Sequence, residues 1–194
     1  LLMTKKLYDY LTGRYHPDLV PIKNSDMKLG HHEMMEDLEG LTKLLQAEGF
    51  ELFILSGYRN HLDQLRIWNE KASGARVLLD DAGNKLDVNV LSDKDIVKNI
   101  CRWSAIPGAS RHHWGTDIDI YCKKSIPTDD YQVQLIPEEV SDEGIFGKLH
   151  LKIDELISEH KSFHFFRPYE EDLGGVSPER WHLSYAPISR ELIK

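Results

Sequence analysis

The chain is poor in cysteine and has no long hydrophobic run, and each absence excludes a class of protein. Its two cysteines, Cys101 and Cys122, are too few for a disulfide framework or a cysteine-rich zinc site. Each lies among apolar residues, so we expect two buried free thiols. No apolar stretch approaches the roughly 20 residues that a membrane-spanning helix needs. No hydrophobic segment follows Lys5 and Lys6 as it would in a signal peptide. We therefore expect a chain without a membrane span, located in the cytoplasm or, alternatively, in the periplasm or cell envelope.

Positive charge is scarce as well. The 24 lysines and arginines are outnumbered by 32 aspartates and glutamates, for a net charge of −8 at pH 7. Nucleic-acid binding relies on a basic face that neutralises phosphates, so the composition argues against a nucleic-acid partner. A hydrophobic fraction of 41% is ordinary for a globular protein. The length predicts one domain spanning residues 1–194.

Hydrophobic periodicity predicts helices interspersed with short strands. Apolar residues recur at three- and four-residue steps over residues 31–48, which is typical of an amphipathic helix, and Gly49 provides its end. Asn60 and Ser92, each followed three residues later by an aspartate, predict the N-caps of two further helices, the second ending near Pro107. The remaining predicted elements are an extended arm over residues 1–30, a hairpin insertion over 76–90, a helix over 148–160, and strands over 50–55, 117–122, 163–166 and 181–185. This order predicts an α+β fold with a small antiparallel sheet and flanking helices.

Two short segments carry the most specific chemical signal. Residues 110–119 read S-R-H-H-W-G-T-D-I-D, and residues 179–182 read E-R-W-H. A catalytic zinc needs three protein ligands, an open position for water and a nearby base. Together the two segments offer imidazoles, an aspartate and a spare carboxylate, which could meet these needs. Gly115 and the alternation after it favour a loop that leads into a strand, with Asp117 and Asp119 on one face. Taken alone, such spacing is more common on solvated surfaces, and the H-E-x-x-H motif is absent.

A third segment follows the predicted strand over residues 50–55. Residues 56–59 read S-G-Y-R, and Gln64 lies about one helical turn beyond them. An arginine at the end of a buried strand can bind a carboxylate through two parallel N–H donors. Taken alone, however, Arg59 is more often a surface residue.

These segments together resemble a known family. The pattern S-x-H-x-x-G-x-x-x-D, then E-x-x-H, with an upstream S-G-Y-R and a glutamine five residues later, is similar to that of the VanY-type D-alanyl-D-alanine carboxypeptidases. These belong to the M15 zinc peptidases, which share the hedgehog-like fold. The resemblance covers roughly residues 56–185 and implies a zinc ion as cofactor. The zinc ligands that it implies are His112, Asp119 and His182, with Glu179 as general base. The substrate-binding residues that it implies are Arg59, Gln64 and Ser110.

The sequence departs from the family pattern in three places. Asp117 stands where members usually carry a small residue, and Arg180 stands where many carry proline. An additional carboxylate beside zinc can alter pKa values or the choice of ligand. The stretch between Gln64 and Ser110 is also longer than in compact members, so we expect the hairpin over residues 76–90 to form a rim that selects substrates.

The activity that the resemblance implies is removal of a terminal D-alanine from peptidoglycan-derived peptides, as a D,D- or an L,D-carboxypeptidase. The expected partner is a peptidoglycan stem peptide or muropeptide. One alternative is a peptidoglycan endopeptidase, which Arg59 argues against because it suits a free carboxylate. Another is a non-catalytic zinc-containing module that binds cell-wall peptides, which Glu179 argues against because a pure binder needs no base.

Overall fold

The computed structural model describes residues 4–193, and its contacts divide the chain into two compact units. We call one the sheet unit, which comprises Asp18–Tyr58, Gly115–Pro168 and Glu179–Lys194. We call the other the α3–α4 unit, which comprises Leu1–Pro17, Arg59–Trp114 and Tyr169–Pro178. The single-domain organisation stays a prediction. Among the described residues, every helix is too short or too polar to cross a membrane.

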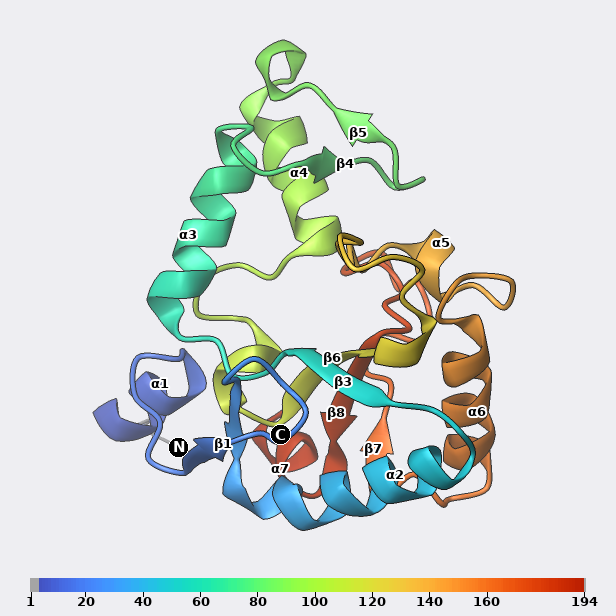
Figure 1. Cartoon of the computed structure of the whole chain (residues 1–194). Coiled ribbons are helices and arrows are strands. Elements are labelled where there is room, and N and C mark those ends of the chain that lie inside the picture. The colour runs from blue at the N-terminus through green and yellow to red at the C-terminus, as the bar shows by residue number, and fades with distance from the viewer. Residues whose placement is uncertain (1–3, 194) are drawn as a thin grey trace. The chain divides into compact units, whose positions relative to one another are not determined.

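An antiparallel sheet forms the centre of the sheet unit, which confirms the predicted α+β class. Its strands are β3 (Leu52–Ser56), β6 (Asp117–Cys122), β8 (His182–Tyr185) and β7 (Phe165–Phe166), paired in that order (Figure 1). The register places Asp119 opposite His182 and Asp117 opposite Ser184. Directly opposed residues have Cβ atoms about 5 Å apart. Residues far apart in the sequence are therefore adjacent on this sheet.

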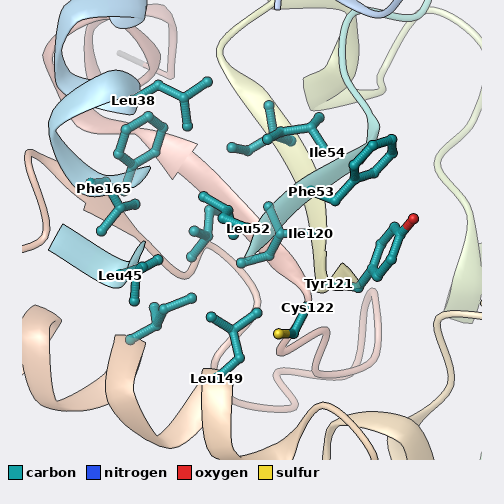
Figure 2. Packing of buried hydrophobic residues seen from close by; sticks show 14 of the residues in the cluster. Leu38, Leu45, Leu52, Phe53, Ile54, Ile120, Tyr121, Cys122, Leu149 and Phe165 are labelled. Carbon is teal, nitrogen blue, oxygen red and sulfur yellow. The ribbon is translucent and has the colours of Figure 1, made fainter. Parts of the chain in front are cut away.

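Helices cover the sheet and close the core. The helices of this unit are α2 (Met35–Ala47), preceded by η1 (His32–Met34), then α5 (Pro137–Val140), α6 (Gly147–Ser158) and α7 (Ala186–Leu192), with η4 (Lys123–Ser125) after β6. Figure 2 shows leucines of α2 and α6 facing apolar residues of β3 and β6. Leu45, Ile120 and Leu149 are almost fully buried, and each such side chain stabilises the fold by about 1.5–3 kcal/mol. The apolar residues that recur along α2 therefore face this core.

The N-terminal prediction is wrong in part. Instead of an extended arm, residues 4–30 contain α1 (Lys5–Leu11), capped by the Thr4 hydroxyl, and β1 (Leu19–Pro21). β1 pairs antiparallel with β2 (Leu29–His31). Residues 1–3 of the predicted arm lie outside the described residues. These elements are too short to show a hydrophobic period, so their formation depends on pairing and packing.

The α3–α4 unit contains the capped helices and the predicted hairpin. Its elements are α3 (His61–Ala72), β4 (Leu78–Leu79), β5 (Lys85–Leu86), η2 (Val88–Val90), α4 (Asp93–Trp103) and η3 (Arg111–Trp114). The side chains of Asn60 and Ser92 accept hydrogen bonds from backbone N–H groups three residues on, as predicted. β4 and β5 pair as the hairpin. α4 ends at Trp103 rather than near Pro107, because Ser104 adopts an extended backbone (φ −164°, ψ 136°).

An arginine holds this unit together. Arg102 of α4 is buried, and its guanidinium forms a bidentate pair with Asp172, at 2.5 and 3.0 Å. Its Nε donates to Asp81 at 2.6 Å, and a further N–H donates to the Gly175 carbonyl at 2.5 Å. Bidentate pairs of this kind are stronger and more directional than single contacts. Arg102 therefore fixes residues 169–178 and the hairpin loop to α4.

Both cysteines are free, as expected, but only one is buried. Cys122 on β6 is 2% exposed, whereas Cys101 on α4 is half-buried. The prediction of two buried thiols is therefore confirmed for Cys122 and wrong for Cys101.

Candidate metal centre

The pairing of β6 with β8 surrounds one imidazole with carboxylates. Asp119 lies directly opposite His182, and Asp117 lies two residues earlier on the same strand face. Glu179 lies in a turn that precedes β8. The backbone carbonyl of Glu179 accepts a hydrogen bond from the His182 backbone N–H at 3.0 Å. The three carboxylates and His182 all belong to the sheet unit. Because Asp117 and Asp119 alternate with apolar residues in a strand that is buried throughout, they point inward.

His182 contacts an acid with each ring nitrogen. Its Nε2 lies 2.8 Å from Asp117 Oδ1. Its Nδ1 lies 3.3 Å from Asp119 Oδ1 and 3.3 Å from Glu179 Oε2. Burial alone would lower the pKa of His182, but the hydrogen bonds to Asp117, Asp119 and Glu179 outweigh it and hold that pKa well above its usual range. The three carboxylates around His182 thus favour a cation at this ring, either a proton or a metal ion.

Asp117 is the most enclosed acid of the group. Its side chain is fully buried, and Oδ2 accepts hydrogen bonds from Thr116 Oγ1 at 2.7 Å and Ser184 Oγ at 3.1 Å. A buried carboxylate is tolerated only when its oxygens are paired. The neighbouring hydroxyls and His182 provide that pairing.

The turn that carries Glu179 is held by arginines. Arg180 contacts Asp154 at 2.6 Å and Asp142 at 2.7 Å, and it donates to the Val140 carbonyl at 2.8 Å. Arg167 donates to Asp154 at 2.7 Å and to the Arg180 carbonyl. Arg180 therefore anchors this turn to α5 and α6, which gives a structural role to one departure from the family pattern.

Arg59 and Gln64 form a rigid pair in the α3–α4 unit. The Gln64 side chain is fully buried, and its Oε1 accepts a hydrogen bond from Arg59 Nη1 at 2.8 Å. Its Nε2 donates to Ser104 Oγ at 3.0 Å and to the Ala105 carbonyl at 2.7 Å. These bonds orient the amide, so Gln64 holds the Arg59 guanidinium in place. Contact of either residue with a substrate stays a prediction.

His112 and His113 lie on η3, in the same unit as Arg59. The Arg59 backbone N–H donates to the His112 carbonyl at 3.1 Å. His113 Nε2 accepts the Gly108 N–H at 3.1 Å, so its Nδ1 carries the proton and donates to the Arg59 carbonyl at 2.6 Å. Burial lowers the pKa of His113 to about 4, which keeps it neutral. The segment with His112 therefore fixes the backbone of Arg59.

The predicted site residues thus fall into two groups. Asp119, His182 and Glu179 are brought together in the sheet unit. Arg59 and Gln64 are brought together in the α3–α4 unit, where His112 and Ser110 are buried on and beside η3. The sequence analysis did not predict that Asp117 contacts His182 or that His113 supports Arg59. A clue to the first was present, since a strand places Asp117 and Asp119 on one face.

Several solved structures share this fold. VanYB in complex with D-alanine-D-alanine has a TM-score of 0.63 and 21% identity, over 93% of this chain and 83% of that chain. A VanY mutant in complex with Zn(II) has a TM-score of 0.61 and 21% identity, over 92% and 85% of the two chains. The LdcB LD-carboxypeptidase has a TM-score of 0.58 and 21% identity, over 89% and 70%. At this level of identity, the similarity shows a common fold.

The family follows from the sequence comparison. The family model for VanY, described as D-alanyl-D-alanine carboxypeptidase, matches residues 27–188. The chain therefore belongs to the VanY family of peptidases. Two proteins of Haemophilus influenzae, both described as uncharacterized, are also similar. One is 34% identical over 100 residues, which are 50% of this chain and 68% of the relative. The other is 36% identical over 87 residues, which are 43% and 63%.

Proposed function

We propose that the chain is a zinc-dependent carboxypeptidase that removes a terminal D-alanine from peptidoglycan-derived peptides. The observation that carries the proposal is the surrounding of His182 Nδ1 by the carboxylates of Asp119 and Glu179, each at 3.3 Å, in a chain of the VanY family. One carboxylate suits the role of metal ligand and the other the role of base. The solved VanY complexes with Zn(II) and with D-alanine-D-alanine support the same assignment.

The residues present fit zinc. The proposed ligands are His112, Asp119 and His182, all buried, and imidazole nitrogens and carboxylate oxygens are ligands that zinc prefers. Three protein ligands leave a fourth position for water, as in catalytic zinc sites. Bound zinc would polarise the scissile carbonyl and lower the pKa of its water to about 7.

Glu179 serves as the general base in this proposal. Its carboxylate accepts a proton from the attacking water and then donates it to the leaving amine. The arginine-anchored turn and the contact with His182 fix the direction of this carboxylate. A base that is already held in one orientation loses little conformational entropy when it transfers a proton.

Arg59 determines where the peptide is cut. Its guanidinium binds the terminal carboxylate of the substrate, while Gln64 holds Nη1 in position. Ser110, buried beside η3, is proposed to contribute to the same binding surface. An arginine that requires a free carboxylate places the last peptide bond at the reaction centre. The D,D- and L,D-carboxypeptidase reactions are both compatible with this arrangement.

Product analysis tests the proposal. The zinc-loaded protein is incubated with a stem peptide that ends in D-alanyl-D-alanine and with a peptide whose terminal D-alanine follows an L-configured residue. The C-terminal amide of each peptide is tested in parallel. We expect mass spectrometry to show loss of a single alanine from one or both free acids. The amides should react about 10²-fold more slowly, because a charged partner is left unpaired.

A matched pair of arginine variants completes the test. Arg59→Ala should lose activity on the free acid and narrow the difference between acid and amide. Arg66→Ala, which removes an exposed arginine from the helix α3 that follows Arg59, should leave both rates unchanged. Equal cleavage of acid and amide by the wild type would instead identify an endopeptidase. Tight binding of zinc and peptide without any product would identify a binding module.

A further inference from the structure

We propose that Asp117 is a positioning residue that selects which nitrogen of His182 binds the metal. In this inference, which rests on the proposed zinc function, the Asp117 carboxylate holds the proton on His182 Nε2. The Nδ1 lone pair is then presented to zinc beside Asp119 and Glu179. Neither the position nor the role of Asp117 follows from the motif that defined the site, because the family pattern usually has a small residue there.

The hydrogen-bond chemistry of the two side chains determines the tautomer. The Asp117 carboxylate acts as an acceptor, since its Oδ2 accepts hydrogen bonds from the hydroxyls of Thr116 and Ser184. The 2.8 Å contact between Asp117 Oδ1 and His182 Nε2 therefore favours a hydrogen on Nε2. A neutral imidazole with a hydrogen on Nε2 has its lone pair on Nδ1. Nδ1 is the nitrogen that lies 3.3 Å from both Asp119 and Glu179. The lone pair therefore points to where a metal ligand is needed.

Asp117 is itself held from several sides. Its backbone is paired with Ser184 in the β6–β8 ladder, and its Oδ2 accepts from the hydroxyls of Thr116 and Ser184. With a fully buried side chain, Asp117 has no alternative solvent contact. Because Asp117 is held in this way, it can keep the His182 ring in one orientation when the metal is absent.

This arrangement has consequences for metal affinity. A carboxylate that accepts the distal N–H of a ligating histidine raises the basicity of the ligand nitrogen and fixes the ring plane. Loss of such a partner typically weakens metal affinity or activity by about 10–100-fold. Asp117→Asn keeps the shape of the side chain but replaces the anionic acceptor by an amide, so it should lose affinity without opening a cavity.

The first measurement is zinc affinity, by competition with a chromophoric chelator, for wild type, Asp117→Asn and Asp129→Asn. We expect about 10–100-fold weaker binding for Asp117→Asn. Asp129→Asn makes the same chemical change at an exposed position and should leave the affinity unchanged. Wild-type affinity in a folded Asp117→Asn protein overturns the inference. Failure of the wild type to bind zinc would instead overturn the proposed function as well.

The second measurement reads the tautomer and needs no variant of Asp117. Zinc-loaded wild type labelled with ¹⁵N-histidine should give a His182 signal with a slowly exchanging proton on Nε2 and with metal-bound Nδ1. His182→Gln assigns the signal by its disappearance. In Asp117→Asn the Nε2 proton should shift and exchange faster, which a purely structural role would not produce. A His182 ring with the metal on Nε2 and the proton on Nδ1 overturns the inference even if Asp117→Asn does not fold.

Discussion

Gln64 illustrates how a single residue can serve a site from inside the molecule. The family resemblance implies that it binds the substrate, whereas the structure shows its amide bonded to Arg59, Ser104 and the Ala105 carbonyl. Because the Gln64 side chain is fully buried, a contribution to the proposed substrate binding would pass through Arg59.

Motif spacing predicts the chemical groups of the site better than their contacts. The types and positions of Asp119, His182 and Glu179 could be identified from the sequence, and the structure brings them together. The contact between Asp117 and His182 could not, because the two residues are 65 positions apart and only the strand register pairs them. Register depends on burial of the whole sheet face, which no local pattern contains.

Glu179→Gln should retain the fold and one zinc per chain but lose most turnover. The amide has nearly the same shape as the carboxylate and cannot accept a proton from water. Removal of a general base typically lowers kcat by about 10²–10⁴-fold. Steady-state kinetics and metal analysis measure the two quantities separately. Glu171→Gln makes the same chemical change at an exposed position and should leave kcat unchanged. A wild-type kcat for Glu179→Gln would assign the base to another group.

Gln64→Ala should weaken catalysis less than Arg59→Ala does. The variant removes the acceptor that orients Arg59 Nη1 but keeps the guanidinium itself. We expect kcat/KM on a free-acid peptide to fall about tenfold, and the free energy of unfolding to fall by about 1–3 kcal/mol, since Ser104 and Ala105 lose their partner. Gln46→Ala, at an exposed position of α2, is the matched control. A larger loss for Gln64→Ala than for Arg59→Ala would indicate direct substrate contact.

At the scale of elements, predictability followed length and capping. The helix predicted over residues 31–48 appears as η1 and α2, and Gly49 ends it with a φ of +91° that favours glycine. The cap residues Asn60 and Ser92 were identifiable because their hydrogen bonds are local. The hairpin β1–β2 and the short helices α5 and α7 were not predicted, because elements of one or two turns, or of three residues, depend on tertiary contacts.

The buried side of α3 could not be predicted from its residue types. Its apolar residues Leu62 and Leu65 are 73% and 37% exposed. The fully buried residue of this helix is Gln64. The cap at Asn60 therefore identified the helix but not the side that packs, because packing here satisfies a polar amide.

Helix α6 contains a buried histidine that should make stability depend on pH. His150 is fully buried, and among residues 4–193 neither of its ring nitrogens has a hydrogen-bond partner. Burial lowers the pKa of His150 well below its usual range, and Arg167 and Arg180 lower it further. Below about pH 6.5 the unfolded chain therefore binds a proton that the folded chain does not.

The free energy of unfolding should consequently fall as the pH drops below about 6.5, by up to about 1.4 kcal/mol per pH unit from this group. Urea unfolding at pH 7.5, 6.5 and 5.5 measures the slope. His150→Leu should remove this contribution, so its stability relative to wild type should be greater at low pH than at high pH. His32→Leu, at an exposed histidine, should keep the wild-type slope. Identical slopes for wild type and His150→Leu would mean that His150 binds its proton equally in the folded and unfolded chains.

At the scale of the whole molecule, the family motifs coincide with the places where the chain passes from one unit to the other. The second segment of the α3–α4 unit begins at Arg59 in the S-G-Y-R segment, and the sheet unit resumes at Gly115, three residues after His112. Glu179 is the first residue of the last segment of the sheet unit. Sequence analysis predicted one domain because composition and length contain no information about such divisions. The motifs nevertheless mark these passages.

Zinc should stabilise the folded chain. The proposed ligands His112 and Asp119 are far from His182 in the sequence, and all three are buried. A ligand that binds only the folded state adds about 2.7 kcal/mol at a free concentration 100 times its Kd. In a chain of 194 residues this corresponds to a rise in Tm of roughly 5–10 °C. Calorimetry with zinc and with excess chelator measures the difference.

The His112→Ala variant tests whether His112 is a zinc ligand. If His112 is a ligand, zinc affinity falls steeply, and the rise in Tm at the same zinc concentration largely disappears. His32→Ala removes an exposed histidine and should preserve the full rise. A wild-type rise in His112→Ala would mean that His182 and its surrounding carboxylates hold the metal without His112. In that case Glu179, whose carboxylate lies 3.3 Å from His182 Nδ1, would be the first candidate for the third ligand.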